Sequence, residues 1–223
     1  MAKIVASGTC GDNLTWTLDD AGTLTITGTG KMTDWSSIPS APWYAYVDQI
    51  KSVVIGEGVT SIGSYAFYWC SALERVTIPE GVTSIGWAAF SSCSALKDVT
   101  IPASVTIIGN FAFDYCSALE RVTIPEGVTS IGWAAFSSCS ALESVTLPDS
   151  VTIIGGRAFI GCTALTSVTI PASVASIGAY AFANCTALKD VRYGGTEEQK
   201  SRIAIAENNT RLIKTTWCCE GGD

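Results

Sequence analysis

The chain has 223 residues, a net charge of −7 at pH 7 and no histidine. The lack of histidine excludes Ser-His-Asp and Cys-His catalysis and the usual zinc sites. The acidic balance argues against nucleic acid or an anionic membrane as a partner, and no apolar run approaches the roughly 18 residues that span a bilayer.

The first 49 residues predict a β-rich N-terminal cap. Leu14, Trp16 and Leu18 alternate with polar residues, a turn-forming Asp-Asp-Ala-Gly segment follows, and Leu24 and Ile26 resume the alternation. This pattern predicts a β-hairpin. Pro-Trp-Tyr at 42–44 predicts a short helical link before residue 50.

A 23-residue repeat occupies residues 50–193. Its most regular marker is a cysteine in each of six copies: Cys70, Cys93, Cys116, Cys139, Cys162 and Cys185. A fixed period of this length is typical of stacked repeats, in which each unit contacts mainly its neighbours.

Each unit predicts two extended stretches and one turn. A Leu-x-x-Val-x-Ile segment alternates as a half-buried strand does, and seven such strands can be counted, from Ile50 to Tyr193. Proline ends most of these strands because it cannot donate to the ladder. Ile-Gly ends a second short stretch, and the following Ala-Phe-x-x-Cys run has room for about one helical or 3₁₀ turn.

Two segments of the repeat are identical. The 27 residues from Cys70 to Leu96 recur from Cys116 to Leu142. Duplication of two repeats explains this identity, and so does consensus design by a human hand.

Residues 194–223 predict a C-terminal cap. Thr196 with Gln199 three residues later has the pattern of a capping box that opens a short helix. Asn208 and Asn209 predict a turn towards Leu212. No linker-like segment interrupts the chain, so we predict one continuous domain.

Stacking places equivalent cysteines about 5 Å apart with parallel Cβ directions. That arrangement suits neither tetrahedral zinc nor a disulfide, so we interpret the six repeat cysteines as a structural ladder of small buried apolar side chains. Neither a metal nor another cofactor is expected. Cys10, Cys218 and Cys219 fall outside the period, and a bridge between the two caps is geometrically implausible.

Aromatic residues occupy the variable positions around Ala-Phe: Tyr65, Tyr68, Trp69, Trp87, Phe111, Tyr115, Trp133 and Tyr180, with Arg157 in one copy. Packing on one another is one interpretation; recognition is the other, because aromatics and arginine are enriched in binding hot spots. On the strands, charged residues alternate in sign, which predicts solvated cross-strand pairs or a polar binding face with a row of threonines. Our candidate ligand-binding residues are Tyr65, Trp87, Phe111, Tyr115, Trp133, Tyr180, Arg75 and Arg121.

The recurring phrase I-P-x-G-V-T-x-I-G-x-x-A-F-x-x-C-x-x-L resembles the BspA-like leucine-rich repeat of bacterial surface proteins. Residues 10–26 resemble the β-rich segment that often precedes such repeats, and residues 193–199 resemble their closing segment. We therefore predict an α/β repeat solenoid: a leucine-rich-repeat superhelix with parallel strands on one face and short helical or 3₁₀ turns on the other. Glycine or serine stands where other leucine-rich repeats often have an asparagine ladder, so their curvature is not assumed.

The resemblance implies a non-catalytic recognition or adhesion solenoid that binds a protein or glycan at a cell surface or in the extracellular matrix. A structural spacer or stalk, and a designed scaffold without a ligand, are the competing hypotheses. The family is typically exported and the first residues do not form a signal peptide. We therefore expect a secreted or surface protein whose leader is absent from this chain; a cytoplasmic protein is the alternative.

Overall fold

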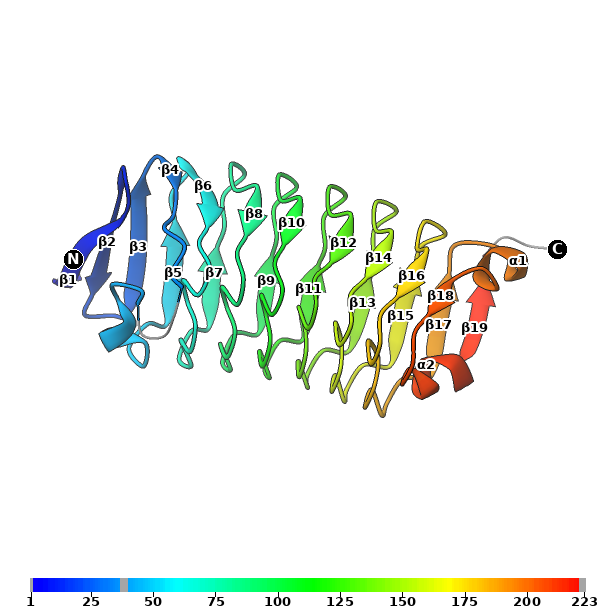
Figure 1. Ribbon diagram of the computed structural model, residues 1–223. Coiled ribbons are helices and arrows are strands. Elements are labelled where there is room, and N and C mark those ends of the chain that lie inside the picture. Colours follow the sequence, from blue (N-terminus) through cyan, green and yellow to red (C-terminus); the bar gives the residue numbers. More distant parts are fainter. Residues whose placement is uncertain (1, 37–39, 221–223) are drawn as a thin grey trace.

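The computed structural model describes residues 2–36 and 40–220, in which the chain winds into one elongated stack of coils (Figure 1). Residues 1, 37–39 and 221–223, which fall within the two predicted caps, lie outside the described residues. The predicted repeat solenoid is confirmed: successive coils contribute parallel strands to common sheets. No helix in the described part of the chain is long and apolar enough to cross a membrane.

One wall of the stack is formed by the seven predicted strands. They are β5 (Ser52–Ile55), β7 (Arg75–Thr77), β9 (Asp98–Thr100), β11 (Arg121–Thr123), β13 (Ser144–Thr146), β15 (Ser167–Ile170) and β17 (Asp190–Tyr193). Residues 23 apart are partners, as in Val122 and Val99, so the central valines form a file that faces the core. The ladder is interrupted between β7 and β9 and again between β11 and β13, at equivalent places in the two duplicated segments.

A second wall of the described chain contains eight short strands, six of which end at the Ile-Gly pairs, as predicted. They are β4 (Gly30–Lys31), β6 (Val59–Ile62), β8 (Ser84–Ile85), β10 (Ile107–Ile108), β12 (Ser130–Ile131), β14 (Ile153–Ile154), β16 (Ser176–Ile177) and β18 (Ala204–Ile205). These strands form one continuous parallel sheet along the stack.

The third side of each coil, from the Gly of Ile-Gly to the cysteine, is here called the turn run. The helical or 3₁₀ turns expected there are wrong in detail, because between residues 63 and 188 these runs are hydrogen-bonded turns without helix. Alternate amides bond within the coil, as Tyr68 N does to Tyr65 O, whereas Phe67 N and Trp69 N donate to the next coil. A helix would require all these amides to bond within their own segment.

The core between the three sides holds a file of stacked phenylalanine rings. Phe67, Phe90, Phe113, Phe136, Phe159 and Phe182 follow one another at centroid distances of 5.1–5.5 Å. All six are fully buried. Each coil therefore buries its largest apolar side chain against its neighbours, which is why the coils stack.

The N-terminal cap closes one end of this core. The predicted hairpin is confirmed by β2 (Leu14–Asp19) and β3 (Thr23–Gly28), and β1 (Ile4–Gly11) pairs with β2. The predicted helical link is the 3₁₀ helix η1 (Tyr44–Tyr46). Beside it, Trp43 stacks on Phe67 at 5.6 Å and donates from Nε1 to Ala66 O at 2.7 Å.

The C-terminal cap substitutes for a further coil. The capping box between Thr196 and Gln199 is present at α1 (Glu197–Lys200), and α2 (Thr210–Lys214) and β19 (Thr216–Cys219) follow. The fully buried Asn209 side chain accepts from Phe182 N at 3.0 Å and donates to Gly178 O at 2.9 Å. Because β3 pairs with β5 and β17 with β19, the strand ladder crosses both predicted cap boundaries, which themselves remain predictions.

Candidate functional site

The turn runs place two backbone positions per coil in the left-handed region. The second and sixth residues after each repeat glycine have positive φ, for example Tyr65 (58°) and Trp69 (63°). Large side chains rarely adopt this conformation, and its cost is of order 1–3 kcal/mol. The hydrogen bonds to the next coil hold the backbone there, as from Trp69 N to Ser91 O at 2.9 Å.

The first row is the file of large side chains near the start of the turn runs. It consists of Tyr65, Trp87, Phe111, Trp133, Arg157 and Tyr180. Successive ring centroids lie 4.6, 5.0 and 4.6 Å apart from Tyr65 to Trp133, and the Arg157 guanidinium lies 5.1 Å from the Trp133 ring and 5.6 Å from that of Tyr180. The row thus brings together five of the predicted ligand-binding residues.

This row is continuous because two sequence positions alternate in filling it. In the duplicated coils the left-handed residue is Ala88 or Ala134, and the preceding Trp87 or Trp133 supplies the ring. Trp87 and Trp133 each remain 38% exposed. These side chains both pack on one another and present an apolar strip to solvent.

The second row is formed by the other left-handed position of each coil. Its members are Trp69, Ser92, Tyr115, Ser138, Gly161 and Asn184. Glycine and asparagine are the residues best suited to this backbone, yet two coils carry a large aromatic instead. Trp69 and Tyr115 are also among the most exposed aromatics of the described chain, at 54% and 58%.

A row of hydroxyls runs beside the second row, one residue after each repeat cysteine. It consists of Ser71, Ser94, Ser117, Ser140, Thr163 and Thr186. Each of the last five donates to the main-chain oxygen of the preceding member at 3.2–3.5 Å. Their lone pairs are left as acceptors along this edge of the stack.

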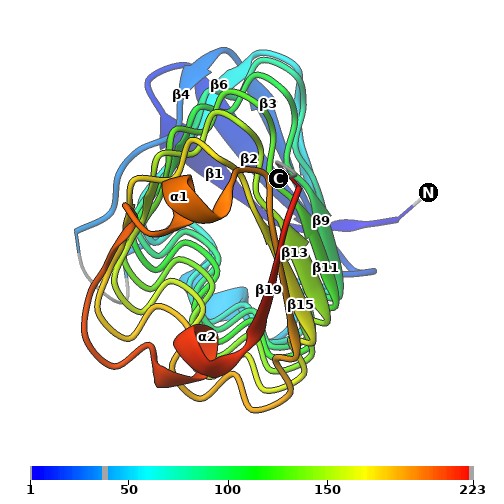
Figure 2. The same ribbon diagram turned by 90° about the vertical axis from the view of Figure 1, so that its right-hand side faces the viewer.

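Both caps build a wall beside these rows. The helical turn at η1 (light blue) and α2 lie along the same edge of the stack, at its two ends (Figures 1 and 2). At the N-terminal end, a groove of about 710 Å³ is bordered by residues of the cap, of the second row and of the hydroxyl row. We call it the N-terminal groove. Its lining is Tyr44, Ala45, Val47, Asp48, Trp69, Ser71, Ser92, Ser94, Tyr115 and Ser117.

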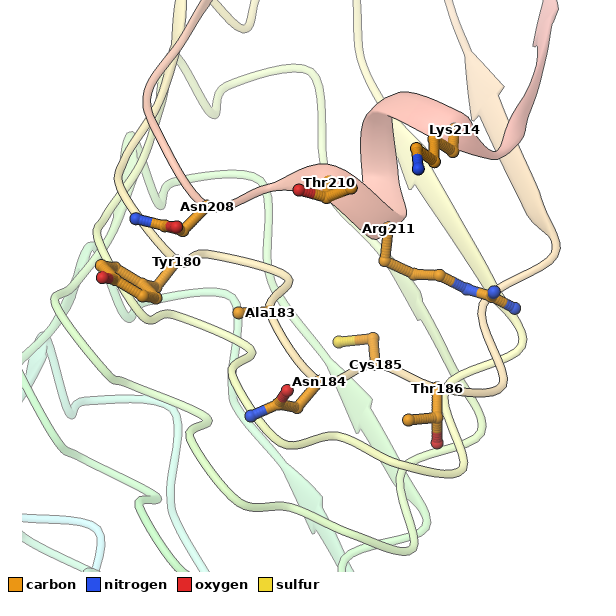
Figure 3. A pocket seen from close by; sticks show the side chains of 9 residues that line it. All are labelled: Tyr180, Ala183, Asn184, Cys185, Thr186, Asn208, Thr210, Arg211 and Lys214. Carbon is orange, nitrogen blue, oxygen red and sulfur yellow. The ribbon is translucent and has the colours of Figure 1, made fainter.

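A second groove, of about 590 Å³, lies against α2 (Figure 3). Tyr180 and Asn208 lie on one side of it, and Arg211 and Lys214 project from α2 on the other. Arg211 Nε donates to Leu188 O at 3.0 Å, so this guanidinium is partly engaged within the protein.

The remaining predicted site residues lie apart from this surface. Arg75 and Arg121 are on β7 and β11, on the strand wall rather than on the turn side. The cross-strand ion pairs predicted there do not form: among the described residues, the ion pairs are Lys200–Glu197 and Arg202–Glu198 in the C-terminal cap. Arg121 borders two small depressions of about 330 Å³ each.

Trp69 is not among the ligand-binding residues predicted from the sequence, yet the structure brings it to the same groove as Tyr115. The sequence does carry a signal for Trp69 and Tyr115: the equivalent positions 184 and 161 hold asparagine and glycine, the residues that favour left-handed backbone.

The six repeat cysteines are fully buried, and all nine thiols are free. Burial raises the pKa of each repeat thiol, to about 12 for Cys185, and raises that of Cys10 to about 11. These thiols are therefore protonated at neutral pH and poor nucleophiles. No cluster of three or more potential metal-ligating side chains occurs within residues 2–36 and 40–220.

One carboxyl group lies beneath the turn surface. Burial raises the pKa of Asp114, and its Oδ1 is buried without a hydrogen-bond partner. Ser91 and Ser137 occupy the equivalent positions in the neighbouring coils and are also buried.

The solved structures similar to this chain include leucine-rich repeat proteins. One from T. pallidum is 25% identical over 93% of this chain and 96% of its own, with a TM-score of 0.62. One from Eubacterium ventriosum is 26% identical over 85% of this chain and 73% of its own, with a TM-score of 0.52. A leucine rich cell surface protein from Faecalibacterium prausnitzii is 21% identical over 89% of this chain and 97% of its own, with a TM-score of only 0.45.

Among curated proteins, none matched the sequence. The family model for the BspA type leucine rich repeat region matches in six copies, over residues 37–165 and 106–210. These matches together span well over half of the chain. The chain therefore belongs to the BspA-type leucine-rich repeat family.

Proposed function

We propose that this protein is a non-catalytic recognition module, located at a bacterial surface or secreted, that binds a protein or glycan through its turn side. The observation that carries the proposal is the exposure of Trp69 and Tyr115 in left-handed backbone. The fold does not require an aromatic there, because the same position accepts serine, glycine or asparagine in other coils, although the Trp69 ring contacts that of Tyr68 at 5.8 Å. An exposed aromatic that is unfavourable for folding is best explained by a contact with a ligand.

The first row enlarges the same surface. Its rings run along the stack beside Trp69 and Tyr115 and remain partly exposed. The first-row rings from Tyr65 to Trp133 pack on one another at 4.6–5.0 Å, so little of their side-chain entropy is lost on binding. The non-catalytic part of the proposal is supported by the absence of histidine and by the burial of the repeat thiols.

Capture experiments with matched variants test this function. The immobilised chain is exposed to extracellular-matrix and cell-surface extracts, and bound material is identified by mass spectrometry and glycan analysis. A turn-side variant carries Trp69→Ser, Tyr115→Ser and Trp133→Ser. A strand-side control carries Thr100→Ala, Thr123→Ala and Thr146→Ala, which are exposed on β9, β11 and β13.

We expect the wild type and the strand-side control to capture the same ligand and the turn-side variant to lose it at an unchanged fold. If only the strand-side control lost the captured ligand, the binding surface would be the strand wall that holds Arg75 and Arg121. No capture by any folded form would favour a spacer or a scaffold without a ligand. Labelling of intact producing cells with an antibody against the chain tests the surface location separately.

A further inference from the structure

The N-terminal groove combines flat apolar surfaces with hydroxyl acceptors. Trp69 and Tyr115 lie on either side of the small Ser92, and the hydroxyl row forms the adjoining edge. Tyr44 and Val47 from the N-terminal cap complete its wall. Few convergent polar groups beside aromatic surface are typical of small-molecule sites.

The spacing of the two aromatic rings follows from the stack. Trp69 and Tyr115 are two coils apart, which is roughly 10 Å at about 4.8 Å per coil. One coil is therefore close to the length of one pyranose unit in an extended oligosaccharide. A chain of sugars lying along the stack would place alternate rings over Trp69 and Tyr115, with the intervening ring above Ser92.

The polar groups of the groove suit a neutral ligand with many hydroxyl donors. Ser94 and Ser117 donate to main-chain oxygens, so their own oxygens are open to accept. Ser71 Oγ donates to Asp48 Oδ1 at 3.2 Å, which fixes the carboxylate at the rim. Among the described residues that line the groove, Asp48 is the one acidic side chain and none is lysine or arginine. An anionic ligand would find no counter-charge here.

A peptide is less well matched to this groove. Binding an extended peptide as an added strand requires free main-chain donors and acceptors, whereas Trp69 N, Ser92 N and Tyr115 N all donate to the next coil. Sugar recognition needs none of these amides. It needs aromatic faces for the C–H side of each ring and oxygens for its hydroxyls, and the groove offers both.

We propose that the N-terminal groove binds a neutral oligosaccharide, with pyranose faces on Trp69 and Tyr115 and hydroxyls on Asp48 and the hydroxyl row. This inference rests on the proposed recognition function and assigns its ligand class. Because the groove spans three coils, it accommodates about three sugar units.

The probes are neutral homo-oligomers of glucose, galactose, mannose and N-acetylglucosamine, from one to six units, presented first on an array and then titrated by calorimetry. We expect at least one series to bind, with affinity rising up to about three units and then levelling off. Trp69→Ser and Tyr115→Ser should each weaken binding about tenfold or more. The matched control Ile213→Ser, which removes an exposed apolar side chain on α2 at the other end of the stack, should leave the affinity within about twofold.

Filling the gap between the rings gives a second, independent test. Ser92→Tyr should weaken binding of the trisaccharide about tenfold while the melting temperature stays within a few degrees of that of the wild type. If the protein binds the oligosaccharide but Trp69→Ser, Tyr115→Ser and Ser92→Tyr leave its affinity unchanged, the assignment is overturned.

Failure of this inference is distinguishable from failure of the proposed function. Capture of a protein by the turn side, with no neutral oligosaccharide bound, overturns the sugar assignment and leaves the recognition function standing. Absence of both sugar binding and capture contradicts both proposals.

Discussion

The Cys93 thiol donates a hydrogen bond to the main-chain oxygen of Phe67, 3.2 Å away in the preceding coil. The same contact recurs along the stack at 3.1–3.3 Å, up to Cys185 and Phe159. Cysteine suits this file because its side chain is small and apolar yet carries a weak donor. The regular cysteine spacing thus reflects a contact between coils rather than redox chemistry.

Thiol reactivity provides the first prediction. In the native protein, Ellman's reagent should label rapidly only Cys218, which is exposed. Cys219 should react more slowly, because it is half-buried, its thiol donates to Glu197 Oε1 at 3.1 Å, and burial and that carboxylate raise its pKa. Cys10 should react slowly because it is buried and burial raises its pKa to about 11. Unfolding in urea should reveal all nine thiols. The double variant Cys218→Ser/Cys219→Ser is the control and should show no rapid phase; rapid reaction of most repeat thiols would contradict their burial.

The second prediction concerns Asp114. Because burial raises its pKa in the folded protein, the protonated form is favoured there and ionisation opposes folding. Its stabilising contribution is present below the unfolded pKa of about 3.9 and is lost as pH rises through the folded pKa. Asp114→Ser, which copies Ser91 and Ser137, should therefore be more stable than the wild type at pH 7, by about 1 kcal/mol. The difference should shrink towards pH 3.

Urea unfolding at several pH values measures this difference. Asp98→Ser, on the exposed surface of β9, is the matched control and should show little change at any pH. If the wild type were instead more stable than Asp114→Ser at pH 7, the surroundings would have to stabilise the ionised Asp114 side chain. That result would contradict the prediction.

The third prediction concerns closure of the last coil. Asn209→Ala removes the acceptor for Phe182 N and the donor to Gly178 O, two main-chain groups of the last repeat coil where it meets the C-terminal cap. Leaving such groups without partners costs about 1–3 kcal/mol. Chemical denaturation should show that loss, whereas Asn208→Gly at the adjacent residue should be nearly neutral, because glycine adopts its positive φ of 63° without strain. Equal effects of the two substitutions would show that the Asn209 hydrogen bonds contribute little.

Much of the fold could be predicted because it depends on local or strictly periodic features. The 23-residue period fixes which residues pair, as Val99 does with Val122. The capping box at Thr196 involves residues three apart. In these cases the sequence pattern and the contact coincide.

The turn runs could not be predicted in the same way. Their backbone depends on amides that bond to the following coil, such as Phe67 N to Ala89 O at 2.7 Å, and no local pattern reveals this. The N-terminal groove likewise requires η1 to dock beside a coil, where Asp48 meets Ser71. The first row could not be predicted either, because its rings come from two different positions of the turn run. Trp87 is the first residue after its repeat glycine and Phe111 is the second, yet their rings are neighbours in the structure.

The fourth prediction separates binding from folding at the second row. Trp69→Asn/Tyr115→Asn replaces two strained aromatics with the residue found at position 184, which tolerates left-handed backbone well. The double variant should equal or exceed the wild type in stability, by up to about 2 kcal/mol. Phe90→Ala in the stacked core is the contrasting control and should lose about 3–5 kcal/mol.

The most direct measurement combines the free energy of unfolding in urea with ligand capture for this Trp69→Asn/Tyr115→Asn variant. The account predicts undiminished stability together with loss of the captured ligand. A variant that is less stable by more than about 1 kcal/mol and still captures the ligand would show that these two aromatics serve the fold, and would contradict the assignment of the turn side as the recognition surface.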